Sequence, residues 1–180
     1  SIIIDEKSAA GKRILYATAY NKGIFKSTDD GKTWQLKNNG IAKNNCAFEI
    51  TLLANGNLFL VVSATPDYES KNNDSLFYSG AVYQSTDAAK TWQKLNITAE
   101  PFFPNGVAAD PDDPNRIYVA CWAGIDLSDL LGNTAAKAKG GNKKIEMKGG
   151  IFLSEDAGKT WSSIFDEQQY VYDVAVDPFN

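Results

Sequence analysis

One short phrase occurs three times in this 180-residue chain, and its recurrence constrains the fold more than any other feature. The copies lie at 27–34, 85–92 and 154–161, and they share the pattern S-x-D-x-G-x-T-W with one substitution. Their spacing is unequal, so the repeated unit must carry loops of variable length. A unit of this size indicates a repeat architecture rather than a solenoid of fixed short period.

Each copy lies between two strand-like runs, which predicts a β-hairpin with the phrase as its turn. The Asp side chain can accept hydrogen bonds from nearby backbone N–H groups, and the Gly can adopt a positive φ. The Thr begins the outgoing strand, and the Trp supplies a large apolar surface for burial. We expect a structural role for all these residues, which are Ser27, Asp29, Gly31, Thr33, Trp34, Ser85, Asp87, Thr91, Trp92, Ser154, Asp156, Gly158, Thr160 and Trp161.

The second copy has Ala89 where the other two copies have glycine. If this position has a left-handed backbone, alanine costs roughly 1 kcal/mol. We therefore expect the second turn to be the least ideal of the three.

A second phrase recurs upstream of the first. Apolar runs at 2–5, 107–111 and 174–178 contain an Asp or Asp-Pro, and the first two are followed by further strand-like runs at 13–17 and 114–120. Such continuous apolar runs predict strands buried on both faces. We predict four-strand units at 1–38, 45–97 and 105–166, followed by the first strand of another unit at 170–176. Repeated four-stranded antiparallel sheets are the blades of a β-propeller, an all-β fold.

These motifs resemble those of the Asp-box (bacterial neuraminidase repeat) β-propellers. That superfamily includes sialidases, xyloglucan-active glycoside hydrolases, sortilin-type receptors and photosystem II assembly propellers. The sequence is most similar to the xyloglucanase-like group, in which DP-x-x-P-x-R-I-Y-x-A precedes G-x-x-x-S-x-D-x-G-x-T-W, and residues 105–161 carry both halves. The resemblance implies the fold, but Asp boxes occur in proteins of unrelated activity and imply little about function.

Three blades and one strand do not close a ring of about 4–8 blades. They would leave sheet edges and apolar faces uncovered. We therefore expect the chain to be part of a larger, seven-bladed propeller, whose remaining blades are its partners.

Composition excludes several kinds of function. The formal net charge of −4 argues against a nucleic-acid binder, and no apolar run approaches the ~20 residues of a membrane span. The chain has no histidine, which excludes His-based catalysis and His-ligated zinc from these residues. We expect no cofactor and no metal site. Cys46 and Cys121 are expected to be buried free thiols, although a disulfide between them is not excluded.

Two long insertions, 63–79 and 122–149, fall between the second and third strands of their units. Strand order places them at the end of the sheets opposite the Asp boxes, and the resemblance implies that this end bears ligands. Candidate ligand contacts are Asp67, Tyr68 and Glu69 in the first insertion and Trp122 and Asp126 in the second. The alternatives are a solvated first loop and a Trp122 that packs the second insertion onto its own blade.

The resemblance implies an extracytoplasmic, carbohydrate-active protein similar to glycoside hydrolases. In such a protein this chain would act as a scaffold and as a glycan-contacting surface. Glycoside hydrolysis requires two carboxylates, but the catalytic residues are unknown, so enzymatic activity is left open. The alternative is a non-catalytic propeller, similar to sortilin, an assembly factor or a cell-surface component, that binds a protein partner through loops 63–79 and 122–149.

Overall fold

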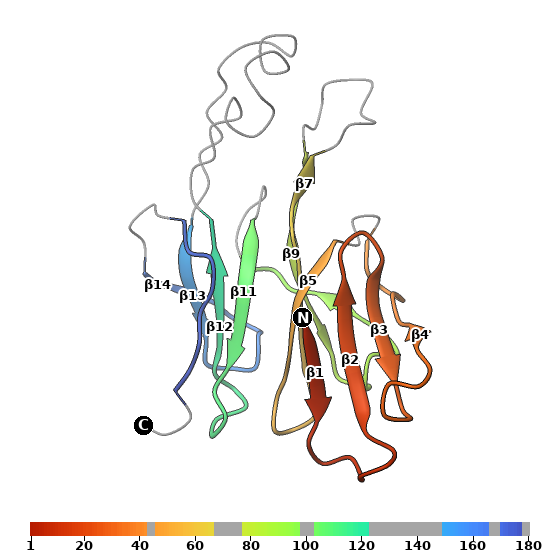
Figure 1. Ribbon diagram of the computed structural model, residues 1–180. Helices are drawn as coiled ribbons and strands as arrows, with labels where there is room; N and C mark the ends of the chain where they lie inside the picture. The colour runs from red at the N-terminus through yellow and green to blue at the C-terminus, as the bar shows by residue number, and fades with distance from the viewer. Residues whose placement is uncertain (43–45, 67–76, 98–102, 123–148, 166–169, 178–180) are drawn as a thin grey trace.

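The computed structural model describes residues 1–42, 46–66, 77–97, 103–122, 149–165 and 170–177. These residues form three four-stranded antiparallel sheets and one two-stranded sheet, and no helix is assigned among them (Figure 1). The prediction of an all-β chain built from four-stranded antiparallel sheets is confirmed.

Each four-stranded sheet is a meander that we call a blade. Blade 1 contains β1 (Ile2–Asp5), β2 (Ile14–Ala19), β3 (Gly23–Ser27) and β4 (Gln35–Leu36). Blade 2 contains β5 (Ala47–Leu52), β6 (Leu58–Val62), β9 (Ala81–Ser85) and β10 (Gln93–Lys94). Blade 3 contains β11 (Pro104–Ala109), β12 (Ile117–Cys121), β13 (Gly150–Ser154) and β14 (Ser162–Phe165). The two-stranded sheet, β7 (Thr65–Pro66) with β8 (Phe77–Tyr78), extends from β6 and β9.

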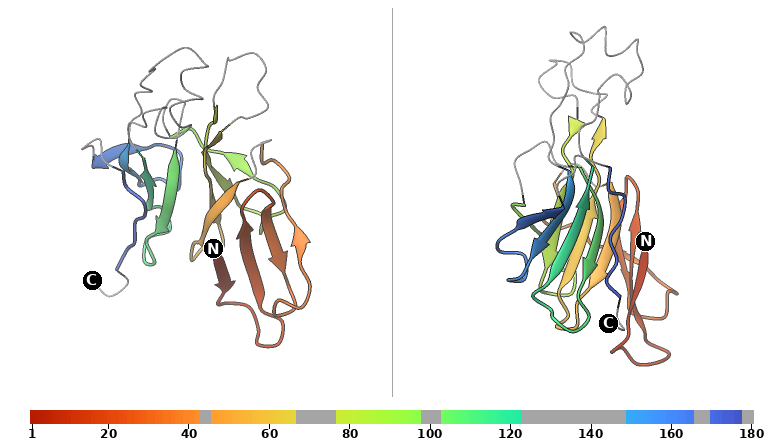
Figure 2. Two further views of the ribbon diagram at one scale, coloured as in Figure 1. Left: turned by 45° about the horizontal axis from the view of Figure 1, so that its top comes forward. Right: turned by 90° about the vertical axis from the view of Figure 1, so that its left-hand side faces the viewer.

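The three blades are arranged as a fan (Figure 2), and strand β5 lies against β1 and β2 on one side and against β11 on the other. The Asp-box turns lie at one end of the sheets, which we call the Asp-box end. The strand ends that flank 63–79 and 122–149 lie at the opposite end, which we call the insertion end (Figure 1).

The core is formed by the two seams, which we define as the interfaces between neighbouring blades. At the seam of blades 1 and 2, Tyr16 and Ile24 pack with Leu60 and Trp92. At the seam of blades 2 and 3, the buried side chains are Leu53, Phe59, Val61, Val82, Val107, Ile117, Val119, Cys121 and Phe152. Blade 2 therefore packs through both faces of its sheet, whereas blades 1 and 3 each pack through the face that meets blade 2.

The Asp boxes close the β3–β4, β9–β10 and β13–β14 turns by the same hydrogen bonds. In the third copy, Asp156 Oδ1 accepts from Ser154 Oγ at 2.9 Å and from Thr160 N at 2.8 Å, and Oδ2 accepts from Thr160 Oγ1 at 2.6 Å. Asp29 and Asp87 make the equivalent bonds. The carboxylates are therefore engaged within their own turns.

Two consecutive residues with positive φ form the tip of each Asp-box turn. In the second copy these residues are Ala88 and Ala89, with φ of 59° and 65°. The left-handed conformation at Ala89 therefore carries the strain expected for alanine, because its Cβ crowds the backbone there.

The expected burial of the first strands on both faces is wrong for β1. Ile2 is 60% exposed and Ile4 is 47% exposed, whereas Ile3 packs at the seam with blade 2. The physical reason is that no described sheet covers the other face of blade 1.

Residues 170–177 lie alongside β11 but have no strand assignment in the described structure. Val171 N donates to Cys121 O at 3.4 Å, and Asp173 closely approaches Gly106. Because a strand requires a repeating ladder of such bonds, a first strand of a further blade at 170–176 stays a prediction.

Candidate functional site

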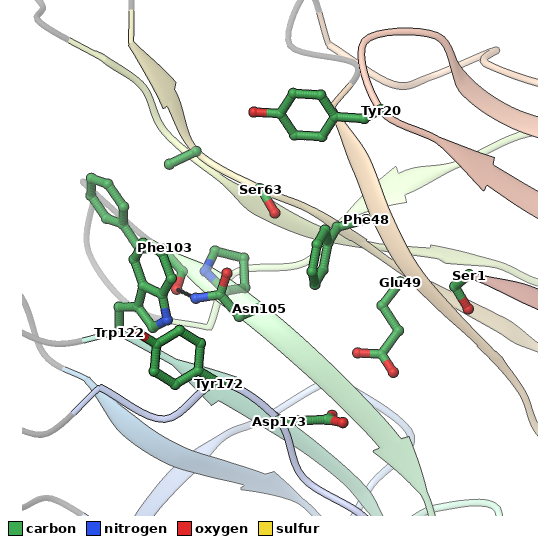
Figure 3. Close-up of a pocket in the computed structure, with 12 residues that line it drawn as sticks. Ser1, Tyr20, Phe48, Glu49, Ser63, Phe103, Asn105, Trp122, Tyr172 and Asp173 are labelled. Carbon is green, nitrogen blue, oxygen red and sulfur yellow. Dashed lines mark hydrogen bonds between the residues drawn. The ribbon is translucent and has the colours of Figure 1, made fainter. Parts of the chain in front are cut away.

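A cavity of about 610 Å³ opens near the insertion end, between the first strands of the blades (Figure 3). Its lining combines aromatic and polar side chains from β5, from the start of β11 and from 170–177. The lining residues are Ser1, Tyr20, Phe48, Glu49, Ser63, Ala64, Phe103, Pro104, Asn105, Trp122, Tyr172 and Asp173. Its size lies within the roughly 300–1,000 Å³ that is typical of ligand pockets.

Two β-bulges direct side chains toward this cavity. The register shifts between Ala47 and Glu49 in β5, and it shifts again between Pro104 and Gly106 in β11. A bulge inserts one unpaired residue and changes the direction of the side chains around it. The inserted residues, Phe48 and Asn105, both line the cavity.

Two carboxylates face this cavity, Glu49 from β5 of blade 2 and Asp173 from the segment 170–177. Glu49 Oε2 accepts a hydrogen bond from Val107 N at 3.0 Å, which fixes the Glu49 side chain across the seam. Burial raises the pKa of Glu49 above its usual value, and the nearby charge of Asp173 raises it further, while the bond from Val107 opposes the shift. Glu49 is thus a carboxyl group whose proton affinity is increased by its place in the cavity.

Gly106 allows residues 170–177 to approach β11 closely. A Cβ at this position would lie 2.8 Å from Asp173 Oδ1 and 2.9 Å from Asp173 Cα. Any larger residue would displace the backbone at Asp173. The absence of a side chain at Gly106 therefore brings Asp173 to the same cavity as Glu49.

Aromatic rings form one wall of the cavity. The Trp122 ring makes edge-to-face contacts with Tyr170 and Tyr172, with centroid distances of 6.0 and 5.4 Å. Trp122 Nε1 is buried and has no hydrogen-bond partner among the described residues. Tyr172 and Phe48 are 67% and 49% exposed, so ring surface is accessible to a ligand. Aromatic surface beside carboxylate and amide groups can bind a molecule that has both apolar faces and hydroxyl groups.

Of the ligand contacts predicted from the sequence, the structure places Trp122 in this cavity. The other predicted contacts, Asp67, Tyr68, Glu69 and Asp126, lie outside the described residues, so they stay predictions.

Glu49 and Asp173 were not predicted from the sequence, although it contains a signal for them. Gly106 and Asp173 directly precede the repeated runs at 107–111 and 174–178, and Glu49 directly precedes the strand-like run at 50–53. Aligning these motifs would have exposed two acidic residues at one position of apolar strands, where a polar residue requires an explanation.

The structure also bears on three other expectations from the sequence: the state of the cysteines, a metal site and a membrane span. Cys46 and Cys121 are buried thiols that are not joined in a disulfide, as predicted, and burial raises the pKa of the Cys121 thiol. Within the described residues, no group of three His, Cys, Asp or Glu side chains is placed to hold a metal ion. The same part of the chain contains no helix that is long and apolar enough to cross a membrane.

No protein-family model matches the sequence. A sialidase from Trypanosoma cruzi is 27% identical over 152 residues, a match that covers 75% of this chain and 13% of the sialidase. Two solved structures are similar across 99% of the chain. They are a GH74 enzyme from Niastella koreensis, with a TM-score of 0.65 and 20% identity, and a GH74 xyloglucanase from Xanthomonas campestris, with a TM-score of 0.67 and 16% identity.

The described sheets and these similarities define the class of the chain, which is an all-β propeller of four-stranded blades. More particularly, its fold resembles that of the two GH74 propellers and its sequence is similar to part of a sialidase, which are the two groups that the Asp boxes predicted. The chain spans 26% and 25% of the two GH74 chains, and 13% of the sialidase. It therefore corresponds to a part of such propellers.

Proposed function

We propose that this chain is part of an extracytoplasmic Asp-box propeller in a carbohydrate-active protein, where it serves as a scaffold and as a glycan-contacting surface. The cavity at the insertion end is the proposed contact site. Similarity to a sialidase and to a xyloglucanase supports the ligand class.

The single observation that carries this proposal is the composition of the cavity wall. Phe48, Trp122 and Tyr172 provide ring surface, while Glu49 and Asn105 provide polar groups at the same opening (Figure 3). Rings cover the apolar face of a sugar, and carboxylate and amide groups hydrogen-bond its hydroxyls.

The scaffold role rests on the uncovered faces of blade 1 and on the partial coverage of the GH74 chains. Ile2, Ile4 and Leu36 are exposed large apolar side chains in blade 1. Further blades of a parent propeller are the proposed partners for these faces, since sheet packing would bury such side chains.

Glycan binding is tested by calorimetric titration of the chain with xyloglucan oligosaccharides. We expect Trp122→Ala and Phe48→Ala to weaken binding at least tenfold, because each removes a ring from the cavity wall. Trp34→Ala is the matched control, since Trp34 is an exposed tryptophan in an Asp box outside this cavity and its loss should leave affinity unchanged.

Equal affinity of the wild type and both cavity variants would refute the proposed site. Absence of glycan binding, combined with a specific protein partner that requires loops 63–79 and 122–149, would favour the non-catalytic alternative. Hydrolysis assays on the parent protein, with Glu49→Gln and Asp173→Asn variants, decide whether the propeller is catalytic. Cell fractionation tests the proposed location.

A further inference from the structure

A second, smaller cavity lies at the seam of blades 1 and 2, at the Asp-box end. Its volume is about 130 Å³, and three of its lining side chains are lysines: Lys26, Lys37 and Lys90. The remaining lining residues are uncharged, so the cavity has no acidic side chain in its wall. This concentration of positive charge stands out in a chain with a formal net charge of −4.

Two of the three ammonium groups are held in place by contacts that leave their charge unneutralised. Lys26 Nζ donates to Ala88 O at 3.0 Å and lies 5.3 Å from the centroid of the Tyr16 ring. Lys37 Nζ donates to Gln35 Oε1 at 3.1 Å. Both lysines are half-buried. Because these contacts fix the lysine side chains, less conformational entropy is lost when a ligand binds.

The charges in this cavity act on one another. Burial lowers the pKa of Lys26, the charges of Lys37 and Lys90 lower it further, and Asp5 and Asp87 oppose the shift. Asp87 is engaged with its own turn, where Oδ1 accepts from Lys90 N at 3.0 Å and Oδ2 accepts from Thr91 Oγ1 at 2.6 Å. Among the described residues, none of the three lysines forms an ion pair. A bound anion would relieve this repulsion.

The next seam of the same molecule shows that the structural contact of Lys26 requires no charge. Strand pairing makes Gln84 the equivalent of Lys26, since Tyr16 pairs with Lys26 and Phe59 pairs with Gln84. Gln84 Nε2 donates to Ala157 O at 3.2 Å, just as Lys26 Nζ donates to Ala88 O. The neutral amide therefore makes the same bridge between blades.

Of the other two lysine positions, one also differs between the seams and one is lysine at both. By position after the Asp-box tryptophan, Leu95 is the equivalent of Lys37, and it packs in the core between blades 2 and 3. Lys159 is the equivalent of Lys90. The blade 2–3 seam thus has one lysine at these three positions, whereas the blade 1–2 seam has three. The two additional charges are not explained by packing.

We propose that the lysine cavity binds a single oxyanion of the sulfate or phosphate type. Lysine ammonium groups bind such anions as point charges, and charge-assisted hydrogen bonds are stronger than neutral ones. Thr28 and Gln35 add polar groups to the wall. The volume is below the roughly 300–1,000 Å³ of pockets for drug-sized ligands, and it suits one anionic group. This site is independent of the proposed glycan site at the opposite end.

The test is a calorimetric and NMR titration of the chain with inorganic sulfate and inorganic phosphate at constant ionic strength. Lys26→Gln copies Gln84 and retains the contact to Ala88 O, while Lys37→Leu copies Leu95. We expect each variant to remain folded and to weaken binding about tenfold or more. Lys159→Gln is the matched control at the other seam, and it should bind as the wild type does.

Glucose 6-sulfate distinguishes a free ion from an anionic ester. Tighter binding than inorganic sulfate identifies an ester as the ligand, and equal binding identifies the free ion. Failure of all three anions to bind would overturn the proposal. An equal loss of anion affinity in Lys159→Gln would also overturn the proposal, because it would show that the anions respond to the overall charge of the chain and not to this cavity.

Discussion

At the residue scale, the Asp boxes show how one short side chain determines a turn. Asp29 Oδ1 accepts from Thr33 N at 2.9 Å, and Ser27 Oγ accepts from Gly31 N at 2.9 Å. Both pairs lie within the same turn, so the turn is specified by local sequence. An aspartate in this setting is most favourable when ionised, because the donors surround its charge.

The local bonds predict a specific acid dependence of stability. Hydrogen bonds from the Thr side chain and backbone lower the pKa of Asp29, Asp87 and Asp156 to about 2. An unfolded aspartate titrates near 3.9. A carboxylate with a depressed folded pKa contributes stability above the unfolded value, and this contribution is lost as the pH falls from about 4 to about 2.

We expect the melting temperature to fall over this pH interval, and we expect Asp156→Asn to melt lower at neutral pH with a shallower acid dependence. Asp112→Asn, at an exposed aspartate outside the Asp boxes, is the control for general charge effects. Identical pH profiles for the wild type and Asp156→Asn would contradict this account.

At the element scale, the packing of the second and third Asp-box turns against the preceding blade limits which residue their tips accept. A Cβ on Gly158 would lie 3.2 Å from Phe59 Cε1 and 3.3 Å from Leu95 Cδ1, so this turn has little room. At the other seam, Lys37 takes the place of Leu95, and Ala89 is fully buried there. The sequence revealed the Ala substitution, but its cause lies in the neighbouring blade.

This comparison predicts different costs for the same substitution in two turns. Gly31 has a φ of 81°, and a Cβ there would meet only Trp34 Cζ2 at 3.6 Å, which is an ordinary contact. We expect Gly31→Ala to cost about 1–2 kcal/mol of unfolding free energy through backbone strain. Gly158→Ala should cost a further ~1–3 kcal/mol through overpacking.

Urea denaturation of both variants measures this difference. A Gly158→Ala variant no less stable than Gly31→Ala would show that the neighbouring blade adjusts without cost, contrary to the packing argument.

At the scale of the whole molecule, the three equivalent tryptophans report which blade faces are covered. Trp92 is 5% exposed, and its Nε1 donates to Lys37 O of blade 1 at 2.8 Å. Trp34 is 37% exposed, and its Nε1 donates to Gly31 O within its own turn. Trp161 packs against the core between blades 2 and 3. Where a preceding blade is present, the Asp-box tryptophan is therefore either buried, as Trp92 is, or partly buried, as Trp161 is.

This pattern predicts that the cost of losing Trp34 depends on the rest of the propeller. In the 180-residue chain, we expect Trp92→Ala to reduce the unfolding free energy by about 3–5 kcal/mol, and Trp34→Ala by ~1 kcal/mol, in the range of less buried positions. In a longer parent with a blade packed on blade 1, the two costs should become similar.

Denaturant titration of both variants in both chains tests this prediction. A Trp34→Ala cost that does not rise in the parent would argue against a blade on that face.

The sequence could predict the strands and turns of all three blades, because a hairpin depends on residues close together in the chain. Of the cavity wall it predicted Trp122 but not Glu49 and Asp173, because these two come from segments far apart in the chain and approach each other only across Gly106. The bulges in β5 and β11 were a second reason that the wall was not predicted, because each changes the side-chain directions that strand alternation alone would assign.

The sequence by itself determined the all-β repeat and its Asp-box turns, since the hydrogen bonds of Ser27 and Asp29 within the turn join residues no more than four positions apart. The lysine cavity was decided by the tertiary structure, because its charges come from two blades and converge only when those blades pack. The same holds for the exposed face of β1, whose apolar sequence predicted burial. Local bonds specify each blade, and long-range packing decides what its surfaces meet.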